Sequence, residues 1–87
     1  MDPTRPYALD PRVALRPEPF GALAYHYGSR RLTFLRSRLL ADVVRGLGDH
    51  ASADAALAAS VPEPKRPAYR KALASLAESG FIQERGG

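Results

Sequence analysis

The stretch that decides the fold is Leu23-Ala24-Tyr25-His26-Tyr27-Gly28-Ser29-Arg30-Arg31-Leu32-Thr33-Phe34-Leu35. Large apolar side chains occupy every second position on both sides of Gly28-Ser29. This alternation indicates two strands joined as a hairpin. Glycine at the first central position predicts a type II′ turn, and such a turn sets Tyr25 opposite Leu32. In that register the large apolar side chains share one face, which we expect to be the buried face. These expected core side chains are Tyr25, Tyr27, Leu32 and Phe34.

A third strand is predicted just before the hairpin, at Val13-Ala14-Leu15-Arg16. It runs into Pro17-Glu18-Pro19, and the prolines reduce its capacity to pair with another chain. Three consecutive strands of this kind form an antiparallel meander, whose middle strand is paired on both sides. The last strand of the meander, Arg30 to Arg36, contains no proline. Its outer edge is therefore open to a further strand.

The rest of the chain predicts three helices. Ser37 is a candidate N-cap, and aliphatic side chains between Leu39 and Leu47 recur at helical spacing. An alanine-rich helix follows from Ser52 to about Ser60. The third begins near Pro64 and ends at Gly80, where a Schellman-type C-terminus is expected. The predicted fold is α+β, an N-terminal three-stranded antiparallel meander followed by three helices.

Length and composition limit the class of protein. The chain has 87 residues, the size of one small domain, and we expect residues 1–12 to be a flexible arm before a domain at 13–87. It contains no cysteine, which excludes disulfides, thiol catalysis and thiolate metal sites. No acid–base pair, phosphate loop or ligand-spaced histidine pair is present, so we expect neither an enzyme nor a cofactor or metal. Without a signal peptide or an apolar span, a cytoplasmic protein that does not bind a membrane is expected.

Positive charge is concentrated in two windows that contain no acid. Arg30 to Arg38 carries four arginines and Lys65 to Lys71 carries four more cations, out of 13 basic and 9 acidic side chains in the whole chain. The first window lies in the last strand and the second in the start of the third helix. Helical spacing puts four residues of that helix on one flank: Arg66, Arg70, Ala74 and Ala77. If this flank faces the last strand, the two form a basic groove for an extended acidic peptide.

The candidate peptide-binding residues belong to the last strand and the third helix. They are Arg30, Arg31, Leu32, Thr33, Phe34, Leu35, Arg36, Arg66, Tyr69, Arg70, Leu73, Ala74 and Ala77. Protection of an edge strand against aggregation is the alternative explanation for its arginines. A winged-helix DNA-binding module is a second functional hypothesis, but the third helix lacks a row of side chains suited to base edges, so we expect no nucleic acid partner. A scaffold that contacts only an enzyme is a third.

One segment of the hairpin region resembles a known family. It is Arg16-Pro17-Glu18-Pro19-Phe20-Gly21-Ala22-Leu23-Ala24-Tyr25-His26-Tyr27-Gly28-Ser29-Arg30-Arg31-Leu32-Thr33-Phe34-Leu35. It closely resembles the mycofactocin biosynthesis chaperones, relatives of the PqqD-like peptide chaperones of pyrroloquinoline quinone biosynthesis, and the pattern extends from Val13 to Gln83.

The resemblance implies a precursor-peptide recognition element with a winged helix-turn-helix-like fold. Such domains bind the leader of a ribosomally made peptide as an added strand between the third strand and the third helix. They present it to a radical S-adenosylmethionine enzyme, which in this family modifies a terminal Val-Tyr pair. The resemblance also implies an acid-rich leader, with the two basic windows as walls of the groove. Iron–sulfur clusters would belong to the enzyme, because this chain has no cysteine.

Overall fold

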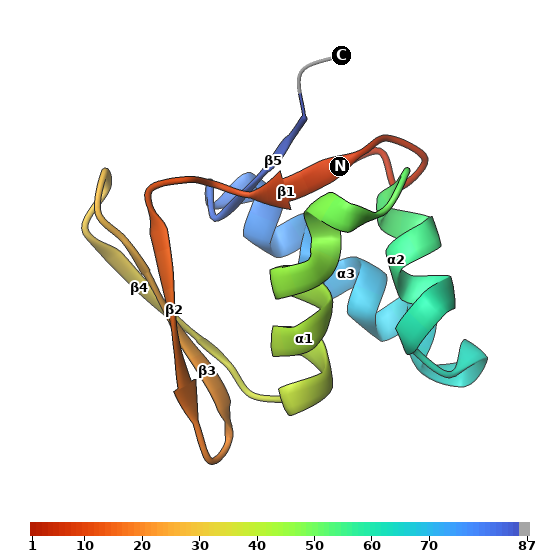
Figure 1. Ribbon diagram of the computed structural model, residues 1–87, viewed down its shortest axis with the longest axis horizontal. Helices are drawn as coiled ribbons and strands as arrows, with labels where there is room; N and C mark the ends of the chain where they lie inside the picture. Colours follow the sequence, from red (N-terminus) through yellow and green to blue (C-terminus); the bar gives the residue numbers. More distant parts are fainter. Residues whose placement is uncertain (86–87) are drawn as a thin grey trace.

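A computed structural model describes residues 1–85 of the chain. These residues form a three-stranded sheet, a two-stranded sheet and three α-helices. In Figure 1 the larger sheet lies beside the helices, and the small sheet lies near the two chain ends. The strands are β1 (Tyr7–Leu9), β2 (Val13–Glu18), β3 (Gly21–His26), β4 (Arg31–Leu35) and β5 (Ile82–Glu84). The helices are α1 (Arg38–Gly46), α2 (Ala53–Ser60) and α3 (Arg66–Glu78), with 3₁₀ turns at Leu47–Asp49 and Glu63–Lys65. The α+β class is confirmed. The strand count is corrected, because residues 1–85 contain five strands in two sheets.

The predicted hairpin register is present, but its turn is of another type. Tyr25 pairs with Leu32, as expected. A type II′ turn needs a positive φ at Gly28, whereas the positive φ of 60° is found at Arg30. The Arg30 N–H donates to the carbonyl of His26 at 2.7 Å, so four residues connect the strands. Gly28 is needed for space instead, since a Cβ there would lie 2.8 Å from the His26 ring.

The face of the sheet that we expected to be buried is exposed to solvent. The exposed fractions of Tyr27, Leu32 and Phe34 are 65%, 52% and 50%. On the opposite face Ala22 and Ala24 are fully buried, and α1 packs against β3. Small side chains on β3 let the helix approach closely, and the large core residues come from the helices and from other segments, such as Tyr7, Phe81 and Ile82. The prediction that Tyr25, Tyr27, Leu32 and Phe34 form the core was therefore wrong, since three of them are exposed and Tyr25 is only partly buried.

The N-terminal segment is packed, in contrast to the flexible arm that we expected for residues 1–12. β1 pairs antiparallel with β5, with Tyr7 opposite Glu84, and the Tyr7 side chain is buried in the core. The carbonyl of Arg5 accepts from the Ala53 N–H at 3.0 Å, and that of Pro3 accepts from the Asp54 N–H at 2.9 Å. These bonds satisfy N–H groups at the first turn of α2, which have no partner within the helix.

The helix ends agree closely with the sequence signals. The Ser37 and Ser52 hydroxyls accept from N–H groups of Leu40 and Ala55, as N-caps do. At the end of α3, Gly80 has a φ of 82°, and the Phe81 N–H donates to the Leu76 carbonyl at 2.9 Å. This is the predicted Schellman motif. It turns the chain into β5, which completes the small sheet.

Candidate functional site

β4 forms one edge of the three-stranded sheet. The strand order is β2-β3-β4, so within residues 1–85 β4 has a ladder partner only in β3. The outward N–H and C=O groups of β4 therefore remain available to another strand. The other edge strand, β2, contains Pro17, which lacks an N–H donor. Of the two edges, β4 is the one that can offer an uninterrupted ladder.

The side chains of β4 divide between two surfaces. Leu35 is buried and Thr33 lies opposite the buried Ala24, so these two belong to the side that faces the helices. Leu32 and Phe34 point to the open face and are half exposed. A strand added beside β4 would therefore place alternate side chains next to each of these surfaces.

The arginines of α3 are directed at α2. The Arg66 guanidinium donates to the carbonyls of Val61 at 2.8 Å and Ala58 at 3.3 Å. Arg70 Nε lies 3.0 Å from Asp54 Oδ1, in the first turn of α2. Carbonyls at a helix C-terminus have no partner within the helix, so a cation is stabilised there. These contacts correct the expected geometry, in which Arg66 and Arg70 border a groove beside β4.

A different flank of α3 lies toward the end of β4. Ser37 lies in the connection between β4 and α1, and its hydroxyl is 2.8 Å from the Tyr69 hydroxyl. Ala72 and Leu76 follow Tyr69 on the same side of the helix by their spacing. Leu73, a predicted site residue, is fully buried and belongs to the core.

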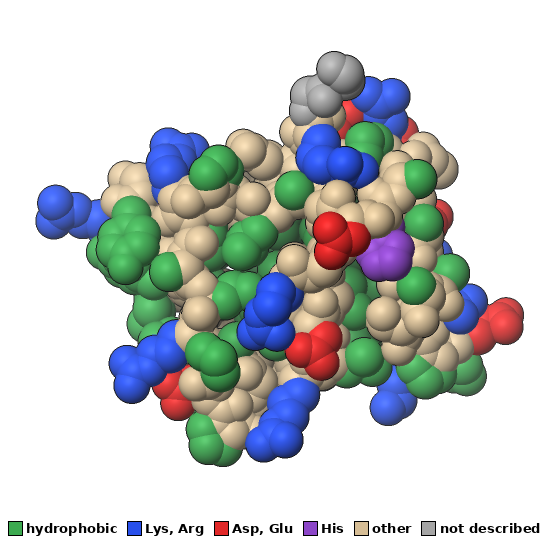
Figure 2. All heavy atoms as spheres, in the orientation of Figure 1, with side chains coloured by type: hydrophobic (Ala, Val, Ile, Leu, Met, Phe, Trp, Pro, Cys, Tyr) green, Lys and Arg blue, Asp and Glu red, His purple; other side chains and the backbone are tan. Residues whose placement is uncertain are grey.

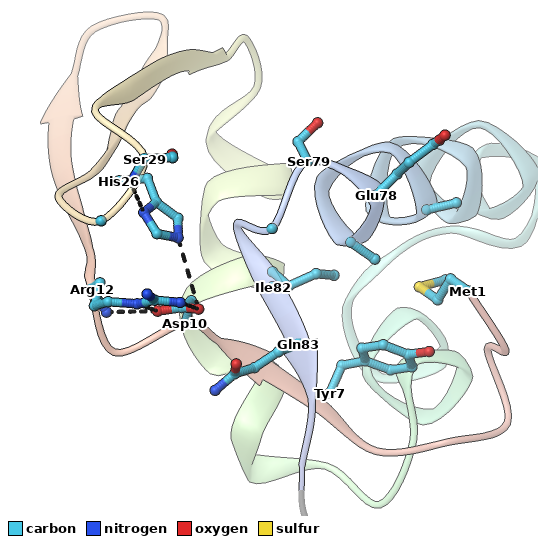
Figure 3. Close-up of a pocket in the computed structure, with 14 residues that line it drawn as sticks. Met1, Tyr7, Asp10, Arg12, His26, Ser29, Glu78, Ser79, Ile82 and Gln83 are labelled. Carbon is cyan, nitrogen blue, oxygen red and sulfur yellow. Dashed lines mark hydrogen bonds and ion pairs between the residues drawn. The ribbon is translucent and has the colours of Figure 1, made fainter.

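Ala74 and Ala77 line a cavity between α3 and the hairpin turn that precedes β4, where His26, Gly28 and Ser29 form part of its wall. It has a volume of about 1010 Å³, and its wall includes Met1, Tyr7 and Gln83 (Figure 3). No residue of β4 is in that wall. The two alanines therefore face the turn next to β4, and the predicted slot along β4 itself stays a prediction.

The arginines of the first basic window have no acidic partner. None of Arg30, Arg31, Arg36 and Arg38 forms an ion pair with a described residue. The guanidinium of Arg36 lies 5.6 Å from the centre of the Phe34 ring, within the range of a cation–π contact. Four arginines around one edge strand produce a field that attracts a negatively charged ligand.

A cluster of charged groups behind the hairpin turn was missed by the sequence analysis. Asp10 is buried, and the Arg12 guanidinium donates to both of its carboxylate oxygens at 3.1 Å (Figure 3). These bonds lower the pKa of Asp10 to about 2. His26 Nε2 lies 3.8 Å from Asp10 Oδ2, and His26 Nδ1 accepts from the Ser29 N–H. The cluster thus ties the hairpin turn to the β1–β2 connection. An acid two residues before an arginine is too common a pattern to have predicted this.

Neither metal-binding nor membrane-spanning features appear in the described part of the chain. Among residues 1–85, no three His, Cys, Asp or Glu side chains gather as a possible metal site. None of the described helices has the length and apolar character that crossing a bilayer requires.

Comparison with known proteins agrees with the resemblance. A model of the peptide chaperone MftB family matches residues 6–83. The chain belongs to this family. It is 45% identical over 83 residues to peptide chaperone MftB of Mycolicibacterium smegmatis, covering 94% of this chain and 81% of that protein. It is 48% identical over 83 residues to the Mycobacterium ulcerans protein of the same name, covering 94% and 76%.

A third relative is peptide chaperone MftB of Mycobacterium tuberculosis, 44% identical over 86 residues that cover 98% of this chain and 79% of that protein. No solved structure matches the chain. The family supports a role as a peptide chaperone and gives no support to the DNA-binding alternative.

Proposed function

We propose that the chain binds the acidic leader of a ribosomally synthesised precursor peptide as a fourth strand along the outer edge of β4. The family description supports a peptide as the ligand. The observation that carries the binding mode is the position of β4, at the edge of its sheet, without proline and among four arginines that form no ion pair with residues 1–85. Backbone hydrogen bonds supply affinity in strand addition, and side chains on either face supply specificity.

The helical wall of this site differs from the one that the sequence analysis expected. Arg66 and Arg70 are engaged by α2, so the flank that begins at Tyr69 is the part of α3 proposed to face the bound leader. Arg30, Arg31 and Arg36 then provide the attraction for its acids. About four or five main-chain hydrogen bonds, at about 1 kcal/mol net each, correspond by themselves to a dissociation constant on the order of millimolar, so apolar side-chain contacts and the attraction of the arginines must supply the rest of the affinity.

The bound leader is presented to a radical S-adenosylmethionine maturase in mycofactocin biosynthesis, in the cytoplasm. The resemblance of the segment Arg16 to Leu35 supports this step, as it supports a winged helix-turn-helix-like relationship of the fold. In this function the chain performs no chemistry itself. It raises the local concentration of the peptide at the enzyme and fixes the direction in which the peptide runs.

Titration of the ¹⁵N-labelled chain with the synthetic leader of the precursor tests the binding mode. Backbone amides of residues 32–35 are expected to shift, together with those near Tyr69. A peptide in which the acids are replaced by amides serves as the matched control and is expected to bind more weakly. Shifts confined to β2 or to β1 and β5, with residues 32–35 unmoved, would contradict strand addition at β4.

A further inference from the structure

The open face of the three-stranded sheet is an apolar surface of which a peptide at the β4 edge would cover only the margin beside β4. Five large hydrophobic side chains are exposed in the described part of the chain, and four of them lie on or beside this face: Phe20, Tyr27, Leu32 and Phe34. Contiguous apolar patches of this kind are uncommon on monomeric proteins and mark interaction sites.

Aromatic contacts hold this surface in a defined shape. The rings of Phe20 and Phe34 meet edge to face with centroids 5.8 Å apart, and those of Tyr25 and Tyr27 do so at 4.8 Å. Phe20, Phe34 and Arg36 enclose a cleft of about 320 Å³, the volume of a few side chains. Rigid aromatic side chains beside a cleft are typical of the residues that dominate binding energy in protein interfaces.

The border of the patch is basic. Arg36 lies against Phe34, and Arg30 and Arg31 follow at the hairpin turn, all without an acidic partner among residues 1–85. Figure 2 shows blue side chains around the green ones over the sheet, on the left of the view. Arg16 is the exception in this border, since it pairs with Glu18 on its own strand. The fitting occupant is therefore an apolar surface edged by carboxylates.

A second copy of this chain fits the face poorly. Two copies face to face would bring their unpaired arginines together in the interface. Strands about 4.8 Å apart and about 20 Å long also give a small contact, well below the roughly 800 Å² per partner of a stable dimer. A contact of this size is typical of a transient complex.

We infer that the open sheet face docks a folded protein partner through an apolar patch with an acidic rim, while the β4 edge holds the peptide. The inference rests on the proposed function in taking the radical S-adenosylmethionine maturase as that partner. β4 carries both surfaces, so enzyme and bound leader would lie side by side on one sheet.

The experiment compares binding of the purified maturase and of the synthetic leader to one set of variants of the full chain. Phe20→Ser combined with Tyr27→Ser removes exposed rings at the two ends of the face and leaves β4 intact. We expect maturase binding to weaken by about ten-fold or more, with leader affinity changed less than about two-fold. Lys71→Ser, on an exposed position of α3, is the control and should change neither. In the wild-type chain, the methyl resonances of Leu23 and Leu32 should shift when the maturase is added.

Each other outcome separates the two proposals. Undiminished maturase binding by the double variant, with both methyl groups unmoved, overturns the docking face and leaves leader binding intact. A wild-type chain that binds the leader but not the maturase overturns both the docking face and the presentation step. A wild-type dimer that the double variant makes monomeric assigns the face to a second copy and overturns the inference. Loss of leader binding at β4 with maturase docking preserved removes strand addition and leaves the docking face standing.

Discussion

The two basic windows look alike in sequence and differ in the folded chain. Each carries four cations and no acid. In the first, around β4, none of the arginines pairs with a described acid, whereas in the second Arg66 and Arg70 are both engaged by α2. A cluster of cations can attract a charged ligand strongly only where the fold leaves its charges unpaired. The first window is thus proposed for recognition, whereas the two arginines of the second belong to the packing between α2 and α3.

Charge reversal on β4 is the strongest test of this contrast. Arg31→Glu combined with Arg36→Glu should weaken binding of the acidic leader by about 30-fold, or about 2 kcal/mol, because two attractions become repulsions. The loss should shrink as salt is raised, since exposed charges are screened. Isothermal titration at low and high salt measures both. An affinity that stays the same at low salt would remove these arginines from the binding site.

Removal of the Arg66 side chain should affect stability and leave binding unchanged. Arg66→Ala deprives the Val61 and Ala58 carbonyls of their donor, at a cost of about 1–2 kcal/mol in the free energy of unfolding. Urea denaturation measures that loss, with Lys71→Ala as the exposed control. The sequence alone predicted weaker leader binding here, so a fall in leader affinity without a fall in stability would restore the original site.

The Arg70–Asp54 pair should contribute little. Both side chains are about four-tenths exposed, at 42% and 41%, so solvent screens their attraction. A double-mutant cycle of Arg70→Ala and Asp54→Ala should give a coupling of about 0.5 kcal/mol or less. A coupling several times larger would show that α2 and α3 depend on this pair.

The ion pair of Arg12 with Asp10, in the β1–β2 connection, predicts a loss of stability that is confined to acidic pH. The pKa of Asp10 falls from 3.8 to about 2 on folding, mainly through hydrogen bonds from Arg12. A lowered pKa stabilises the fold fully above the unfolded value, and this contribution is lost as the pH falls from about 4 through about 2. Thermal melts across this range should show less dependence on pH for Asp10→Asn than for the wild type. An equal slope in both would exclude Asp10 as the cause.

Local features were predictable because neighbours in sequence determine them. The pairing of Tyr25 with Leu32 follows from the length of the hairpin, and the Schellman end follows from Gly80 before Phe81. Alternation also predicted correctly that the large side chains share a face. It contains no information on which face meets the helices, and the small Ala22 and Ala24 decide that only once α1 is in place.

For the site, sequence predicted which residues share a side of α3 but not which element that side faces. The helical spacing of Arg66 and Arg70 was right, but which element lies opposite them depends on how α2 and α3 pack. The β1–β5 sheet joins two three-residue strands from opposite ends of the chain. Such short segments carry no pairing signal of their own, since burial of Tyr7 and Ile82 in a core built by other elements holds them together.

The pairing of β1 with β5 has a practical consequence for anyone who truncates the chain. A fragment that starts at Val13 would lose Tyr7, the strand beside β5, and the carbonyls that serve the first turn of α2. This deletion would destabilise β5 and the start of α2 before it affects the three-stranded sheet that begins at Val13. Shortened versions made for crystallisation should therefore begin before Pro3. An affinity tag at either end should leave the pairing of β1 with β5 undisturbed.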